Sequence, residues 1–249
     1  MKNMIIGSSI ISLDKINSTN SYANQLSVDK KPISGTVILA QEQTEGKGQE
    51  GNKWESQVGK NLTFSILLFP DKLRADHQFI LSKAISLGII DYLKPLTKDF
   101  SIKWPNDIYC NNRKIAGILI ENSVMGSYLS ESIVGIGLNV NQEYFSKEAN
   151  NPVSLKALTN TEFVIVDELN KLLECLDIRY KELIDKKYDG INDSYLINLF
   201  RYNEIHEFTS SGIKFSGKIV GVSVYGKLQI ELADGTISLF GFKEVEYVI

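Results

Sequence analysis

The residues best equipped for chemistry lie at positions 103–107, which read Lys-Trp-Pro-Asn-Asp. Apolar residues flank this run, so we expect it at the end of a strand, where the proline blocks continuation of the ladder. Asn111-Asn112 is a hairpin signal, which would place Asp107 and Lys114 on adjacent antiparallel strands. Such a pair is either a structural ion pair or an active-site pair, and the pattern leaves both interpretations open.

A glycine-rich run at positions 46–51, Gly-Lys-Gly-Gln-Glu-Gly, fits the dinucleotide-binding pattern Gly-x-Gly-x-x-Gly. That pattern must open a helix whose N-terminus faces the pyrophosphate, whereas here Trp54 and then a strand follow. An NAD-dependent oxidoreductase is therefore disfavoured. The run is either a flexible hairpin or a loop that closes over an anionic ligand. The second interpretation is favoured because Lys47 and Lys53 add positive charge there.

Two more stretches carry polar residues beside apolar ones. Ser18-Thr19-Asn20 is, taken alone, most often the cap of a helix. Residues 135–141, Gly-Ile-Gly-Leu-Asn-Val-Asn, are, taken alone, most often a strand end with a turn.

Composition excludes several classes of protein. The 249 residues carry a formal net charge of -3, which argues against a nucleic-acid binder without excluding a local basic patch. Two cysteines and two histidines are too few for a disulfide scaffold or a Cys/His zinc site. The apolar stretch at 4–11 is too short for a membrane span, and no secretion signal follows. We expect a cytoplasmic protein without membrane contact.

Hydrophobic periodicity predicts the elements that hold these residues. Strands are expected at 9–13, 35–41, 62–69, 101–104, 108–110, 115–122 and 132–137, and helices at 18–26, 76–93 and 166–184. The last helix carries one apolar stripe, formed by Leu169, Leu172, Leu173, Leu176, Tyr180, Leu183 and Ile184. This mixture predicts an α/β or α+β domain at residues 1–203. The remaining residues, 204–249, show short alternating runs broken by glycine, with a hairpin signal at Asp234-Gly235, and predict a small closed β-barrel.

Taken in order, the motifs resemble those of biotin–protein ligases. They read Ser-Thr-Asn, Gly-x-Gly-x-x-Gly-x-x-Trp, Lys-Trp-Pro-Asn-Asp, Arg-Lys-x-Ala-Gly-Ile-Leu-x-Glu and Gly-Ile-Gly-Leu-Asn-Val-Asn. The resemblance implies a mixed sheet with helices of the class II synthetase-like type and a C-terminal SH3-like barrel. It also implies an ATP-dependent ligase that, with Mg²⁺, makes biotinyl-5′-AMP from biotin and ATP. The enzyme would then transfer biotin to a lysine of a biotin carboxyl carrier domain.

The same resemblance implies roles for individual residues. Lys114 would lie nearest the reacting carboxylate and phosphate, and Asp107 would orient or deprotonate the incoming lysine and offer a ligand to magnesium. Biotin would be bound by Ser18, Thr19, Asn20, Gln43, Gly46, Lys47, Gly48, Gln49, Lys114 and Gly117. ATP or the adenylate would be bound by Lys47, Gly51, Trp54, Lys103, Asn106 and Asn139. Trp54 would help to fold the loop over the adenylate and exclude water. Residues 151–155 would form a second ordering loop.

The sequence departs from the family in its glycine-rich loop. The family loop usually reads Gly-Arg-Gly-Arg-x-Gly-Arg, but Lys47, Gln49 and Asn52 stand at the arginine positions here, and Glu50 adds a negative charge. Arginine holds phosphate with a planar fork that lysine cannot copy, so we predict weaker retention of the acyl-adenylate.

Other functions remain open. A lipoate–protein ligase or octanoyltransferase shares the fold, although the Lys-Trp-Pro-Asn-Asp run with its nearby Arg-Lys favours biotin. A non-catalytic biotin-binding relative is a further alternative, against which Lys103, Asp107 and Lys114 argue. No DNA-binding domain is expected, because only 17 residues precede Ser18. The sequence is compatible with a homodimer.

Overall fold

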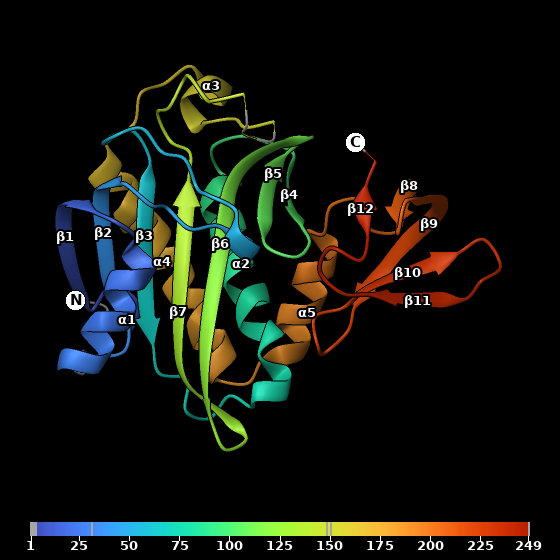
Figure 1. Ribbon diagram of the computed structural model, residues 1–249, viewed down its shortest axis with the longest axis horizontal. Helices are drawn as coiled ribbons and strands as arrows, with labels where there is room; N and C mark the ends of the chain where they lie inside the picture. The colour runs from blue at the N-terminus through green and yellow to red at the C-terminus, as the bar shows by residue number, and fades with distance from the viewer. Residues whose placement is uncertain (1–3, 31, 148, 150, 249) are drawn as a thin grey trace.

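The computed structural model describes residues 4–30, 32–147, 149 and 151–248. Its larger sheet is mixed and has seven strands (Figure 1). The strands are β1 (Ser9–Ile16), β2 (Thr36–Gln43), β3 (Leu62–Leu68), β4 (Phe100–Lys103), β5 (Asp107–Cys110), β6 (Arg113–Met125) and β7 (Tyr128–Leu138). Their order is β1-β2-β3-β7-β6-β5-β4. β1 and β2 are parallel, and the other neighbours are antiparallel. The mixed sheet implied by the family resemblance is thereby confirmed.

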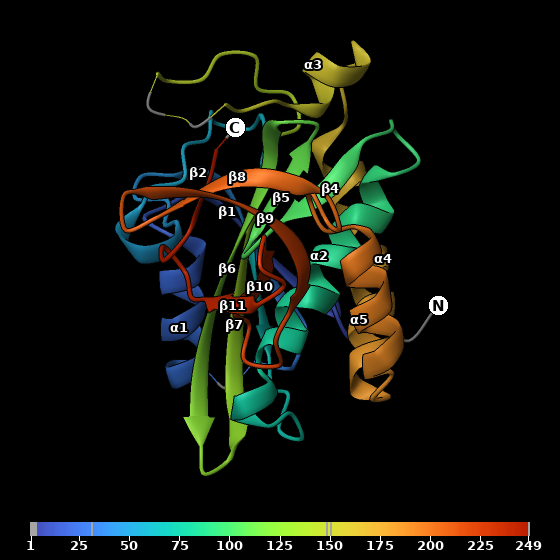
Figure 2. The same cartoon turned by 90° about the vertical axis from the view of Figure 1, so that its right-hand side faces the viewer.

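Helices cover both faces of this sheet. α2 (Phe79–Leu93), α4 (Ile165–Ile184) and α5 (Tyr188–Ile197) lie on one side, and α1 (Thr19–Lys30) lies on the other (Figure 2). Every residue of β3 is buried, because Ile66 and Leu68 lie in the main core with residues of α2 and α4, whereas Leu67 lies in a second core under α1. Ala23 and Leu26 of α1 pack on apolar side chains of β2, β3 and β7. This second, smaller core holds the middle of α1 against the sheet.

Most predicted elements are present, with different ends. The helix predicted from residue 76 begins at Phe79, after a short 3-10 turn at Ala75–His77. Helices α3 (Leu155–Thr159) and α5 were not predicted. The apolar stripe of α4 is buried from Leu169 to Leu183, but Ile184 is 46% exposed. The prediction was wrong for Ile184 because the helix ends there, and its last residue turns away from the packed face.

The C-terminal residues form a separate five-stranded antiparallel sheet. Its strands are β8 (Ile205–Ser210), β9 (Ile213–Val222), β10 (Leu228–Leu232), β11 (Ile237–Phe240) and β12 (Glu246–Tyr247), in the order β11-β10-β9-β8-β12. Gly235, at φ +82°, lies in the predicted hairpin between β10 and β11. The arrangement fits the SH3-like domain that was expected. Across the described ranges, no helix has the length and apolar character that a membrane span requires.

The two sheets are joined through Trp104. Its indole is 3% exposed, and Nε1 donates a hydrogen bond of 2.9 Å to the carbonyl oxygen of Gly226, in the turn between β9 and β10. The expected domain boundary at residues 203 and 204 falls in the segment between α5 and β8. Trp104 therefore fixes the C-terminal sheet beside the 103–107 turn.

Candidate active site

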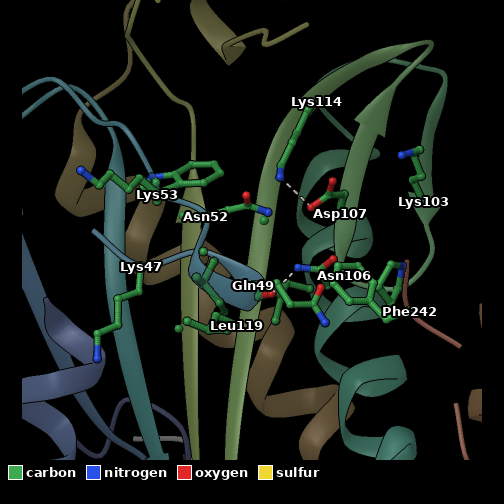
Figure 3. Close-up of a pocket in the computed structure, with 18 of the residues that line it drawn as sticks. Lys47, Gln49, Asn52, Lys53, Lys103, Asn106, Asp107, Lys114, Leu119 and Phe242 are labelled. Carbon is green, nitrogen blue, oxygen red and sulfur yellow. Dashed lines mark hydrogen bonds and ion pairs between the residues drawn. The ribbon is translucent and has the colours of Figure 1, made fainter. Parts of the chain in front are cut away.

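A cavity of about 360 Å³ lies where the central strands, the glycine-rich loop and the C-terminal sheet meet (Figure 3). Residues from 18–20, 43–54, 103–107, 114–119, 135–137 and 242–247 line it. The cavity wall thus contains residues from every motif singled out in the sequence, although these motifs are far apart along the chain.

One end of the cavity is polar and buried. Gln43, on β2, accepts hydrogen bonds at Oε1 from the backbone N–H and the hydroxyl of Thr19, at 2.8 and 3.0 Å. Ser65, on β3, donates to the Thr19 hydroxyl at 2.7 Å. The free N–H at the start of α1 is thus satisfied by a strand residue. Because Ser18 and Thr19 are 2% and 3% exposed, this end offers hydrogen bonds in a place shielded from water.

Asn20 extends this network beneath the sheet. Its Nδ2 donates to Oε2 of Glu121 at 2.6 Å, and its Oδ1 accepts from Ser65 at 2.5 Å. A Cβ at Gly135 would stand 2.4 Å from the same Oδ1, closer than real side chains approach. Gly135 is therefore needed to make room for Asn20, and the two residues position the polar end together.

The opposite side of the cavity carries an ion pair. Lys114 Nζ lies 2.7 Å from Asp107 Oδ1, and the side chains are 27% and 18% exposed. Figure 3 shows the two side chains turned toward each other from neighbouring strands. Within the described residues, Lys114 is the only partner of that buried oxygen. The adjacent strands predicted from the Asn111-Asn112 turn are confirmed as β5 and β6.

The backbone of Lys114 is held from outside the hairpin. Its N–H donates to the carbonyl oxygen of Asn151, and its own carbonyl accepts from the N–H of Val153, both at 2.9 Å. The side chain of Ser154 accepts from Ala157 N–H and caps α3. Residues 151–155 therefore fix the position of the β6 backbone that carries the Lys114 side chain.

A second cation, Lys103, stands between two aromatic rings. Its Nζ lies 5.1 Å from the ring centre of Tyr109 and 4.8 Å from that of Tyr247. Burial lowers the pKa of Lys103, and the nearby Asp107 carboxylate acts in the opposite direction. Lys103 and Lys114 together place two ammonium groups around one carboxylate, so the site has an excess of positive charge for a phosphate or a carboxylate.

Trp54 closes the cavity from the glycine-rich loop. A Cβ at Gly137 would stand 2.2 Å from Cε2 of the indole, and a Cβ at Gly117 would stand 3.1 Å from Cζ3. Lys114 Nζ lies 5.6 Å from the ring centre. The indole therefore lies flat on β6 and β7, over positions where only glycine leaves space.

Replacing Gly137 with alanine is expected to expel the Trp54 indole. We expect a red shift of tryptophan emission, since Trp104 stays buried, and a loss of stability of about 1–3 kcal/mol in urea unfolding. Gly190→Ala is the matched control, because a Cβ there meets nothing within 4 Å. Unchanged emission from Gly137→Ala would contradict this packing.

The loop itself is a short hairpin rather than the start of an α-helix. Lys47 and Lys53 face each other as a β-bridge, and residues Gln49–Gly51 form a single 3-10 turn between them. In Figure 3, the amino groups of Lys47 and Lys53 lie on the far side of the loop from the Lys114–Asp107 pair. Gln49 lines the cavity, and its buried Oε1 has no hydrogen-bond partner among the described residues. The side chain of Glu50 lies outside the described part of the chain.

The cavity wall contains most of the predicted site residues. They are Ser18, Thr19, Asn20, Gln43, Lys47, Gly48, Gln49, Trp54, Lys103, Asn106, Asp107, Lys114 and Gly117. Asn106 also donates from Nδ2 to the carbonyl oxygen of Ile118 at 2.8 Å, which fixes the turn before β5.

Three predicted residues stand outside that wall. Asn139 is 3% exposed, and its Nδ2 donates to the carbonyl oxygen of Val153, so it supports the 151–155 segment instead of facing the cavity. Gly46 is buried against the carbonyl oxygen of Trp54, and Gly51 is exposed at the outer side of the loop.

Sequence reasoning missed the contribution of the C-terminal sheet. Phe242, Lys243, Val245, Glu246 and Tyr247 all line the cavity, and Figure 3 shows Phe242 on the side of Asn106. The sequence held no signal for this, because a small β-barrel pattern does not reveal which of its turns faces another domain.

The site fits a metal ion that arrives with its ligand. Asp107 and Glu246 are the carboxylates of the cavity wall, and the described ranges contain no group of three or more metal-binding side chains. Magnesium in nucleotide enzymes is commonly held by one or two carboxylates together with substrate phosphates. Asp107 suits that arrangement, with Lys114 already balancing part of its charge.

Comparison with known proteins gives one consistent set of matches. A family model described as the biotin/lipoate A/B protein ligase family matches residues 12–139. The bifunctional ligase/repressor BirA of Bacillus spizizenii is 29% identical over 248 residues, covering 96% of this chain and 74% of the relative. A biotin–[acetyl-CoA-carboxylase] ligase of Paracoccus denitrificans is 34% identical over 134 residues, which are 51% of this chain and 53% of that protein. The biotin protein ligase from Aquifex aeolicus in complex with biotin and ATP has a TM-score of 0.80 at 28% identity, covering 97% of this chain and 100% of that chain.

Proposed function

Since this chain belongs to the biotin/lipoate A/B protein ligase family, we propose that it is a biotin–protein ligase. It activates biotin with ATP to biotinyl-5′-AMP and transfers the biotin to a lysine of a biotin carboxyl carrier domain. The observation that carries the proposal is a single cavity with a buried polar end at Thr19 and Gln43 and a cationic side at Lys114 and Lys103. Because the reaction consumes ATP, a cytoplasmic location is part of the same proposal. Repression, which the name of the Bacillus relative includes, is not.

The polar end favours biotin over lipoate. The ureido ring of biotin has N–H donors and a carbonyl acceptor, whereas the dithiolane ring of lipoate has neither. Thr19 and Gln43 Oε1 already pair with each other, but the Ser18 hydroxyl and Gln43 Nε2 have no hydrogen-bond partner among the described residues, and an apolar ring would leave them unpaired and desolvated. Leaving such buried groups without partners is costly, so this end discriminates against a dithiolane.

The cationic side suits the activation step. Attack of the biotin carboxylate on the α-phosphate brings several negative groups together, and Lys114 and Lys103 offset their repulsion. Magnesium carried by ATP would neutralise further phosphate charge, with Asp107 as its protein ligand. The Trp54 indole covers the cavity and keeps water from the mixed anhydride.

The transfer step needs a neutral amine on the carrier lysine. Asp107 is the carboxylate beside Lys114, so we assign it to orient that lysine and accept its proton. The amine attacks the biotinyl carbonyl, an amide bond forms, and AMP leaves with the electrons of the broken acyl–phosphate bond.

Exchange of labelled pyrophosphate into ATP tests the ligand class. With biotin we expect rapid exchange that depends on Mg²⁺, and with lipoate or octanoate we expect none above background. Exchange with lipoate alone would favour the lipoate ligase instead. Biotin binding without exchange, and without transfer of labelled biotin to a carrier domain, would identify a non-catalytic relative.

Gln49→Arg is expected to slow the leakage of biotinyl-AMP. A guanidinium at this cavity-lining position can hold the phosphate with paired hydrogen bonds, which glutamine cannot do. We expect release to slow about tenfold, the equivalent of one charged hydrogen bond. Release is measured by rapid filtration of enzyme preloaded with labelled adenylate.

Gln57→Arg is the control for added charge near the loop. Gln57 is exposed and does not line the cavity, so the same substitution there should leave release unchanged. Equal leakage from wild type and Gln49→Arg would refute the idea that the missing arginines weaken adenylate retention.

A further inference from the structure

A second cavity, of about 320 Å³, lies outside the candidate active site, where α2 and α5 meet the C-terminal sheet. Five aliphatic side chains from the three structures line it: Ile80, Leu196, Val220, Val222 and Val224. No residue is shared between the two cavity walls. The proposed ligase reaction therefore does not account for this space.

The wall of this cavity includes a buried cation, Lys83 of α2, which is 5% exposed. The other charged residues buried in the described part of the chain, Glu168 and Asp177, each have a lysine partner. Lys83 has none there, and its Nζ donates only to the amide oxygen of Asn192, at 2.9 Å. A buried ammonium without an anion is costly, so this site lacks one half of an ion pair.

The aromatic rings around Lys83 do not replace a carboxylate. Its Nζ lies 5.7 Å from the ring centre of Phe79 and 5.3 Å from that of Tyr195. Such contacts stabilise a cation weakly compared with an ion pair in a dry site. Burial accordingly lowers the pKa of Lys83 to about 8.

We propose that this cavity binds a small monocarboxylate with an aliphatic body, whose carboxylate pairs with Lys83 and whose body lies against the aliphatic wall. A single cation matches a monoanion better than a phosphate dianion. Asn192 holds the ammonium in place, and its own Nδ2 can donate to the second carboxylate oxygen. The ligand would span α2, α5 and the C-terminal sheet, and so would stabilise their packing.

Octanoate is the probe that tests this site, by calorimetric titration of the full chain. We expect it to bind about tenfold or more tightly than 1-octanol, which lacks the charge, and acetate, which lacks the body. Lys83→Met should lose the preference for octanoate over 1-octanol and melt at no lower temperature than wild type. Lys94→Met, an exposed lysine just after α2, should behave like wild type.

A second pair of variants distinguishes octanoate binding in this cavity from octanoate binding in the active-site cavity. Lys114→Ala should keep octanoate binding, and Val220→Phe, which fills the second cavity from the C-terminal sheet, should lose it. Loss in Lys114→Ala with retention in Lys83→Met would overturn the proposal and place octanoate in the active site. Neither comparison depends on whether the protein ligates biotin.

The affinity for octanoate should also depend on pH in one direction. Lys83 must be protonated and octanoate ionised for the two to pair, so affinity should be constant from about pH 6 to 8 and fall above pH 8, given the Lys83 pKa of about 8. The other titratable side chains of the wall are His77 and Tyr188, and Tyr195 packs against the ammonium. The Lys83→Met variant should lose the fall above pH 8, and a fall that persists in it would contradict the assignment.

Discussion

Lys114→Ala is expected to reduce biotinyl-adenylate formation by about 10²–10³-fold, as loss of one charge-stabilising donor does in other enzymes. The ammonium of Lys114 faces the cavity beside Asp107, and the 151–153 segment holds its backbone in place. The variant keeps that backbone but has no positive charge where the biotin carboxylate meets the α-phosphate. Pyrophosphate exchange measures the loss, and equilibrium binding of labelled biotin should weaken far less than exchange, because the polar end that holds the ring is intact.

Arg113→Ala is the control for this variant. Arg113 is the neighbouring cation in the same hairpin, but it is exposed and does not line the cavity. We expect exchange close to that of wild type. If Lys114→Ala retains wild-type exchange, Lys114 has only the structural role of neutralising Asp107, and the activation site lies elsewhere.

Asp107→Asn is expected to separate the two steps of the reaction. The amide keeps the shape of the carboxylate and can still accept from Lys114, so adenylate formation should fall modestly. Transfer from isolated biotinyl-AMP to a carrier lysine should fall by about 10²–10⁴-fold, the usual effect of removing a general base. Single-turnover transfer with preformed adenylate measures this directly.

Measuring transfer at higher pH checks the assignment of Asp107 as the base that deprotonates the carrier lysine. A base that deprotonates the carrier lysine matters less once solvent can do so, so raising the pH should partly restore transfer in Asp107→Asn. Asp99→Asn, at an exposed position before β4, is the control and should transfer normally. Equal losses in both steps, with no recovery at high pH, would show instead that Asp107 acts by holding Lys114.

Local sequence patterns were sufficient to predict the structure where the chain forms a tight hairpin. The Asn111-Asn112 turn placed Asp107 and Lys114 side by side, because Asn111 readily adopts the positive φ of 53° that the hairpin needs. The glycine-rich run was predicted not to open an α-helix, and it forms a hairpin closed by Lys47 and Lys53. In both cases the contacts join residues only a few positions apart.

Helix α5 shows where local patterns were not sufficient. Its sequence contains Gly190 and several asparagine and aspartate residues, which are poor helix formers, so periodicity gave no clear signal. Ile191 and Tyr195 are nevertheless buried, at 1% and 0% exposure. Packing against α2 stabilises a helix that its own propensities would not.

The features of the site that could not be predicted from the sequence depend on contacts between segments that are distant along the chain. The spacing Gly135-Ile-Gly137 looks like an ordinary strand end, and only the docked Asn20 and Trp54 side chains explain both glycines. Tyr247 reaches Lys103 because Trp104 fixes the C-terminal sheet beside the same turn.

The local turn thus determined that Asp107 and Lys114 lie together, and the order of the motifs, through the family resemblance, indicated the chemistry and the mixed sheet. The buried polar end of the active site, and a buried Lys83 that has no anionic partner among the described residues, arose only when separate layers packed together, because burial depends on what covers a residue rather than on its neighbours in the chain.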